Sequence, residues 1–282
     1  MKFKIFFLVL ILAAAFPFRV FADEKKISIT CSLFPVYDFA REVAGDNANV
    51  NLLLKPGTEP HEFEPTPVDI KNLNDSDVFI FIGEHWAKEI SNSLNNLQIL
   101  NASDGIEFAS GDPHIWLDLE NAKKIVKNIA DGLAKLKPEK SEIFYSNAEN
   151  FCAKLNKLDE KFMNLKERSG GKTLIFAGEF AFNYFVRHYG FNFISAYDGE
   201  NEPSIKRMAD VLKFIEENHA KFILSDSFEI SAITSSIAEQ TKTEILFFDA
   251  GERISQENFD SGLTFLKLME NNYESLKKFC DD

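Results

Sequence analysis

Four side chains in this 282-residue sequence combine metal-binding chemistry with positions in loops: His61, His114, Glu179 and Asp249. His61 is one of five histidines and lies between prolines in residues 55–67. Prolines exclude a helix or a central strand there, so the loop holds its imidazole in a nearly fixed place. Two imidazoles and two carboxylates suit a divalent transition metal, and the carboxylates balance its charge. These residues therefore predict a metal site.

The expected secondary structure places these residues where an α/β fold binds ligands. Apolar strands alternate with helices in both halves of the chain, which predicts parallel sheets covered by helices. Ligands of open α/β sheets lie beyond the carboxyl ends of strands. His61 follows the second expected strand (49–54), Glu179 follows the strand at 173–177, and Asp249 follows the strand at 244–248. His114 lies in the loop before a helix at 119–136.

One long helix separates the two halves. Residues 138–168 contain no glycine and no proline after the first position, and apolar residues recur at helical spacing. About 31 residues at about 1.5 Å each make a rod about 46 Å long. The predicted fold is α/β, with two lobes, each a parallel sheet flanked by helices, joined by one long rigid connecting helix. The predicted divisions are a signal peptide (1–22), an N-terminal lobe (23–137), the connecting helix (138–169) and a C-terminal lobe (170–282).

The first 22 residues resemble a secretory signal peptide, with lysines before an apolar run and Val-Phe-Ala at a cleavage position. Its removal takes the formal charge from −13 to −16, which argues against nucleic acid as a partner. We expect a periplasmic protein. Three cysteines permit at most one disulfide in that compartment, and Cys152–Cys280 is the one pairing that we consider.

Each of these residues also has a simpler interpretation. A loop histidine beside proline is often only exposed to solvent, and a carboxylate after a strand often caps a helix. We expect Asp118 to cap the helix that begins at residue 119. The histidines outside the predicted site are expected to face solvent: His85, His188 and His219. The sequence lacks the His-Glu-x-x-His of zinc proteases, the Gly-x-Ser-x-Gly of hydrolases and a phosphate-binding loop.

Two motifs resemble those of a known family. Pro-His-Glu-Phe-Glu-Pro at 60–65 and Asp-Pro-His-Ile-Trp-Leu-Asp at 112–118 are similar to the histidine motifs of metal-binding proteins from ABC importers for zinc and manganese. Residues 179–190 and the strand that ends at Asp249 are similar to the second half of that family, so the resemblance covers essentially the whole mature chain. It implies two α/β lobes joined by one long helix.

The resemblance also implies a ligand set. His61 and His114 fall on the family's first two histidine ligands, and Asp249 falls on its carboxylate ligand. Glu179 falls where zinc-type members often have histidine and manganese-type members have glutamate. Residues 103–111 lack the long His-rich loop of many zinc-type members. Both departures, and the harder carboxylate ligand, place Mn²⁺ slightly ahead of Zn²⁺, although intrinsic affinity rises toward zinc.

The sequence therefore predicts a monomeric periplasmic receptor that captures Mn²⁺ or Zn²⁺ between its lobes and delivers it to an ABC permease of the inner membrane. We expect no enzymatic turnover and, because of the connecting helix, only small lobe movements. Two alternatives remain open at this point. One is an exported metallohydrolase that uses the same four residues, and the other is an adhesin that is indifferent to metal.

Overall fold

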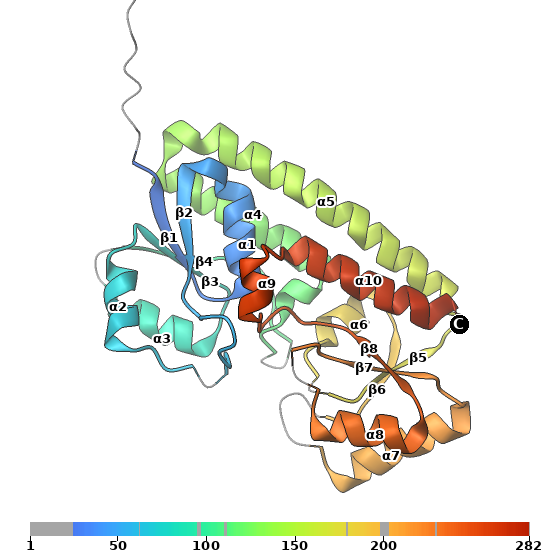
Figure 1. Ribbon diagram of the computed structural model, residues 1–282. Coiled ribbons are helices and arrows are strands. Elements are labelled where there is room, and N and C mark those ends of the chain that lie inside the picture. Colours follow the sequence, from blue (N-terminus) through green and yellow to red (C-terminus); the bar gives the residue numbers. More distant parts are fainter. Residues whose placement is uncertain are drawn as a thin grey trace, which may run out of the picture.

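The fold is built on two four-stranded parallel sheets (Figure 1). The computed structural model describes residues 25–61, 63–94, 97–109, 112–178, 180–197, 203–228 and 230–281, so the expected signal peptide lies outside it. The first sheet has the order β2-β1-β3-β4, with β1 Ile27–Cys31, β2 Ala48–Leu52, β3 Val78–Phe81 and β4 Gln98–Asn101. The second has the order β6-β5-β7-β8, with β5 Thr173–Phe176, β6 Asn192–Ser195, β7 Phe222–Ser225 and β8 Glu244–Phe247.

Helices flank each sheet and complete two α/β lobes (Figure 1). Those of the first half are α1 Phe34–Ala44, α2 Pro67–Asn74, α3 His85–Ser93 and α4 Leu119–Leu136. Those of the second half are α6 Asn183–Tyr189, α7 Ile205–Asn218, α8 Ala232–Thr241, α9 Gln256–Asp260 and α10 Phe265–Asp281. The predicted fold class is confirmed. Among the described residues, no helix is both long enough and apolar enough to cross a membrane.

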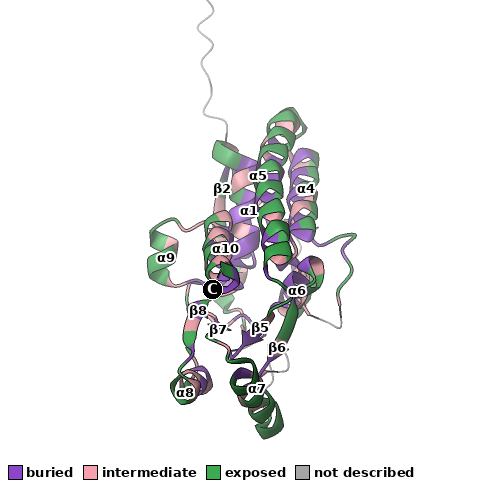
Figure 2. Ribbon diagram, turned by 90° about the vertical axis from the view of Figure 1, so that its right-hand side faces the viewer, coloured by how far each residue is buried: buried purple, intermediate pink, exposed green. Residues whose placement is uncertain are grey.

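The long helix α5, Ser141–Arg168, is continuous over 28 residues and follows a 3₁₀ turn at Pro138–Lys140. At about 1.5 Å per residue it is about 42 Å long. It buries one apolar stripe that includes Phe144, Phe151 and Phe162. Figure 1 shows α5 beside α4 at its start and beside α10 at its end, and Figure 2 shows its outer face exposed. The predicted connecting helix is therefore present.

The start of α4 lies where the sequence predicts it, whereas the last helix differs from its prediction. The Asp118 carboxylate accepts hydrogen bonds from the backbone N–H groups of Glu120 and Asn121, which confirms it as the cap of α4. The sequence of residues 258–279 predicts a single last helix, and this prediction is wrong, because the chain forms the two helices α9 and α10 there. The break contains Gly262 at φ 76°, a backbone conformation that glycine adopts without strain and that a helix cannot contain.

The Cys152–Cys280 pairing that the sequence left open is not present, because both cysteines are free thiols. Arg168 at the end of α5 makes an ion pair with Asp281, so Cys280 lies near that end of the helix. Cys152 is 16 positions before Arg168 on α5, a distance of about 24 Å along the helix. A disulfide needs Cα atoms within about 7 Å of each other, so this fold cannot form the bridge.

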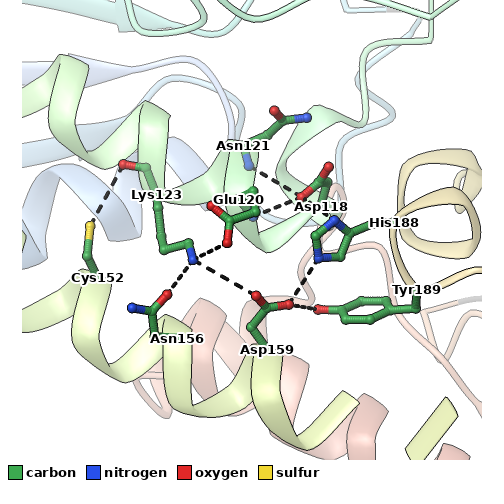
Figure 3. Close-up of polar contacts among 9 residues, drawn as sticks. All are labelled: Asp118, Glu120, Asn121, Lys123, Cys152, Asn156, Asp159, His188 and Tyr189. Atoms are coloured by element: carbon green, nitrogen blue, oxygen red, sulfur yellow. Dashed lines mark hydrogen bonds and ion pairs between the residues drawn. The ribbon is translucent and has the colours of Figure 1, made fainter. Parts of the chain in front are cut away.

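His188 was expected to face solvent, and the structure places it between two carboxylates instead (Figure 3). Its Nδ1 lies 3.2 Å from Asp118 Oδ1, and its Nε2 lies 3.1 Å from Asp159 Oδ1. The Tyr189 hydroxyl also donates to Asp159, over 2.7 Å. These contacts raise the pKa of His188, mainly through its hydrogen bond with Asp159. The last turn of α6 is thus tied both to the start of α4 and to the middle of α5.

Candidate metal centre

Three metal-ligand side chains from distant parts of the sequence converge at one point: His61, His114 and Glu252. One donor atom from each lies within 4.8 Å of the other two. Glu252 lies between the imidazoles, with Oε1 2.9 Å from His61 Nε2 and Oε2 2.8 Å from His114 Nε2. His114 is buried, Glu252 is half-buried and His61 is exposed. Two imidazole nitrogens and a carboxylate form a ligand set used by zinc and other transition metals.

The loop that carries His61 is held by contacts with the segment that follows Glu252. The Gly57 N–H donates to the carbonyl of Ile254 over 2.8 Å. The Arg253 guanidinium lies 2.9 Å from the Glu59 carboxylate. These two contacts join a loop of the first lobe to a loop of the second lobe. They place His61 next to the carboxylate with which it pairs.

His114 is fixed by its neighbours in the segment 112–117. Its Nδ1 lies 2.7 Å from Asp112 Oδ1, which also accepts its backbone N–H over 2.9 Å. Nδ1 therefore carries a proton, and Nε2 faces the site. The ring packs edge-on against Trp116 at 5.3 Å, and the Trp116 indole N–H donates to the Ala250 carbonyl over 2.7 Å. One short segment thus orients the imidazole and binds the loop that leads to Glu252.

Glu252 reaches the histidines because the chain turns sharply after β8. Gly251 has φ 75°, which favours glycine, and an added Cβ would lie 3.3 Å from a methyl carbon of Leu268. Two residues before Gly251, the Asp249 backbone makes two hydrogen bonds of 2.8 Å with the Asn272 side chain of α10. The Asp249 N–H donates to the amide oxygen, and the Asp249 carbonyl accepts from the amide nitrogen. The end of β8 is therefore anchored to α10, and the turn at Gly251 directs Glu252 toward the two histidines.

Without metal, the three side chains form an ion-paired cluster. Burial opposes the charged form of His114, but the Glu252 charge and hydrogen bonds to Asp112 and Glu252 outweigh burial and raise its pKa to about 10. Burial also opposes ionisation of Glu252, and His114 and His61 outweigh it and hold the pKa of that carboxyl far below its usual range. The apo site therefore contains a carboxylate and a protonated His114 at neutral pH.

The predicted residues Asp249 and Glu179 have different outcomes. Asp249 is not among the three converging side chains, since its carboxylate accepts hydrogen bonds from the Ser227 N–H over 2.6 Å and the Ser227 hydroxyl over 2.9 Å. Burial and the neighbouring Asp249 charge raise the pKa of Asp226 to about 7. Asp226 and Asp249 are therefore a pair of neighbouring carboxyl groups, separate from the cluster of His61, His114 and Glu252. Glu179 lies outside the described residues.

Two cavities border Glu252, and one of them also borders His61. One cavity of about 740 Å³ is lined by residues of the first lobe, including His61 and Trp86. Another of about 280 Å³ is lined by residues at the strand ends of the second lobe, including Ser225 and Asp226. Glu252 borders both cavities. The site therefore lies in the cleft between the lobes.

Comparison with known proteins supports the resemblance seen in the motifs. The family model described as zinc-uptake complex component A, periplasmic, matches residues 29–279. The chain belongs to this family. Members of it are uptake and binding components, and the chain is accordingly a binding protein and not an enzyme.

Individual relatives align over nearly the whole chain. The high-affinity zinc uptake system protein ZnuA of Bacillus subtilis is 29% identical, covering 91% of this chain and 89% of that protein. The zinc-binding lipoprotein AdcA of Streptococcus pneumoniae is 28% identical over 92% of this chain, which spans only 56% of AdcA.

Solved structures share the fold. The crystal structure of the Zn(II)-bound ZnuA-like domain of Streptococcus pneumoniae AdcA superimposes with a TM-score of 0.80 at 29% identity, covering 92% of this chain and all of that domain. The metal-dependent lipoprotein YcdH of Bacillus subtilis gives a TM-score of 0.81 at 29% identity, covering 90% of this chain and 99% of YcdH.

Proposed function

We propose that this protein captures Zn²⁺ in the cleft between its lobes and that His61, His114 and Glu252 are ligands of the ion. The convergence of these three donors within 4.8 Å is the observation that supports the proposal. Glu252 takes the carboxylate role that the sequence suggested for Asp249. Glu179 remains the expected fourth ligand, on the sequence resemblance alone.

Zinc, and not manganese, is the proposed cargo. The sequence placed Mn²⁺ slightly ahead because of Glu179 and the missing His-rich loop. The relatives that align over this chain are described as zinc uptake or zinc-binding proteins, and one similar structure contains Zn(II). Two imidazoles and a carboxylate also form one of the ligand sets of tetrahedral zinc sites, which take a fourth ligand.

The proposed mechanism is capture followed by transfer to an ABC permease of the inner membrane. Zinc replaces the proton on His114 Nε2 and takes over the contacts that Glu252 makes with both imidazoles. Each lobe contributes donors, since His61 and His114 come from the first lobe and Glu252 from the second. Docking on the permease is proposed to separate the two sets of donors and release the ion. Export to the periplasm and a monomeric state complete the proposal.

Thermal unfolding with and without Zn²⁺ tests the ligand assignment. A bound ion stabilises the folded state by mass action, so the wild type should gain several degrees in Tm with excess zinc. Glu252→Gln should lose most of that gain, because an amide is a poor zinc ligand.

Asp249→Asn is the matched control for this measurement. It makes the same change three residues earlier, on a carboxylate that faces Ser227, and should keep the gain. A normal zinc shift in Glu252→Gln together with a lost shift in Asp249→Asn would reverse the assignment. Mn²⁺ titrated under the same conditions tests the choice of metal, because a larger shift with Mn²⁺ contradicts zinc as the preferred cargo.

A further inference from the structure

We propose that Asn183 of α6 is a positioning residue through which the second lobe sets the orientation of the His114 imidazole. This inference rests on the proposed function, since it assumes that His114 Nε2 binds the ion. The link runs from Asn183 through Asp112 to His114. It joins a helix of one lobe to a ligand of the other, and no residue of this link except His114 is itself a proposed ligand.

The first part of the link is the contact between Asp112 and His114. Asp112 Oδ1 accepts both the ring Nδ1–H and the backbone N–H of His114, over 2.7 and 2.9 Å. A carboxylate on the second ring nitrogen fixes the ring and raises its strength as a ligand, and loss of such a partner weakens metal binding about 10- to 100-fold in other sites.

The second part is the contact between Asp112 and α6. Asp112 Oδ2 accepts a hydrogen bond from Asn183 Nδ2 over 3.0 Å, so both carboxylate oxygens have a partner. The Tyr184 hydroxyl donates to the Asp112 backbone carbonyl over 3.1 Å and accepts the Ala109 N–H over 2.7 Å. The first turn of α6 therefore holds both the backbone and the side chain of the residue that orients His114.

The third part is the position of α6 itself, which packs on the core of the second lobe. The Phe185 ring meets Phe248, directly after β8, at 4.9 Å in an edge-to-face contact. The last turn of α6 is fastened to Asp118 and Asp159 through His188 (Figure 3). Because α6 contacts both lobes, we expect a movement of one lobe relative to the other to strain the contact between Asn183 and Asp112. Lobe position and ligand orientation are coupled by this route.

The test is a double-mutant cycle in the full-length exported protein, with Zn²⁺ affinity measured by competition with a chelating fluorophore. Asn183→Ala should weaken zinc binding about tenfold, the effect of one hydrogen bond to a charged acceptor. Asn183→Asp should weaken it further, because two carboxylates would then face each other across 3.0 Å. Asn218→Ala is the control, since that exposed amide donates only to a carbonyl of its own helix, and its affinity should be unchanged.

The decisive variant combines Asp112→Asn with Asn183→Asp. The new Asn at 112 accepts from His114 through its oxygen and donates to the new carboxylate at 183, so the pair is restored with reversed polarity. The double variant should bind zinc no more weakly than Asp112→Asn alone, whereas Asn183→Asp in the wild-type background should weaken zinc binding. Additive losses in the two backgrounds would overturn the positioning role.

A shift of the His114 Nδ1–H proton resonance in apo Asn183→Ala provides a readout that general destabilisation would not move, and an unchanged resonance also contradicts the proposal. The outcomes separate the two inferences. A wild type that binds no zinc refutes the proposed function. A wild type that binds zinc while the cycle is additive refutes only the role of Asn183.

Discussion

Zinc binding at neutral pH should release about one proton, because the apo site holds His114 in its protonated form. His114 Nε2 must lose that proton before it can bind a metal. The surroundings raise the pKa of His114 to about 10. A pH of 7.5 is about 2.5 units below this pKa, so zinc must displace a bound proton. At about 1.4 kcal/mol per unit, that displacement costs roughly 3 kcal/mol of binding free energy.

Isothermal titration calorimetry in buffers of different ionisation enthalpy measures this release directly. The slope of binding enthalpy against buffer enthalpy should correspond to about one proton at pH 7.5. The apparent affinity should rise about tenfold per pH unit between pH 7 and 9 and level off above pH 10. His219→Asn is the matched control, because this exposed histidine lines neither of the cavities that border Glu252 and should leave the slope unchanged. A slope of zero for the wild type at pH 7.5 would refute the reasoning.

Three further predictions concern stability and the turn before Glu252. The pKa of His114 is raised on folding from its ordinary 6.5 and that of Glu252 is lowered, so the Tm of the apo protein should fall as the pH rises from about 6.5 to about 10 and also as it drops below about 4.5, with a plateau only between about 4.5 and 6.5. Phe162→Ala, which empties a fully buried ring site on α5, should lower the free energy of unfolding by about 3–5 kcal/mol in urea titrations, and a loss under 1 kcal/mol contradicts the packing. Gly251→Ala should weaken zinc binding and lower Tm, because φ 75° strains alanine and its Cβ would press on Leu268; unchanged affinity would show that the turn tolerates a side chain.

Most elements of the fold could be predicted from local signals. Pro138 and the long run without glycine gave the connecting helix, and the expected bounds of α4 match the structure. The break between α9 and α10 was missed because the helical periodicity around Gly262 outweighed one glycine. His188 was misjudged because its partners Asp118 and Asp159 lie 70 and 29 positions away, beyond what a local pattern can show.

The site was predictable in part, for a similar physical reason. His61 and His114 stood out through residue type, proline neighbours and loop position, and the structure brings them together. Asp249 was favoured because it directly follows a strand, yet its side chain turns to Ser227 and Glu252 is directed to the histidines. The available signal was Gly251, which marks a turn just before a second carboxylate. The direction of that turn depends on the contact of Asp249 with Asn272, 23 positions later, which no local pattern reveals.

The three donors that meet at this centre also determine when in folding the centre can exist. His114 and Glu252 are separated by 138 positions, and the loop that leads to Glu252 is anchored by Asn272 of α10. Contacts of such long sequence separation form late, because chain entropy must be lost before they contribute. We therefore expect a partly unfolded chain to present isolated histidines and to bind zinc weakly. Under the proposed function, full zinc affinity requires the completed fold, so metal retention would report on the integrity of both lobes at once.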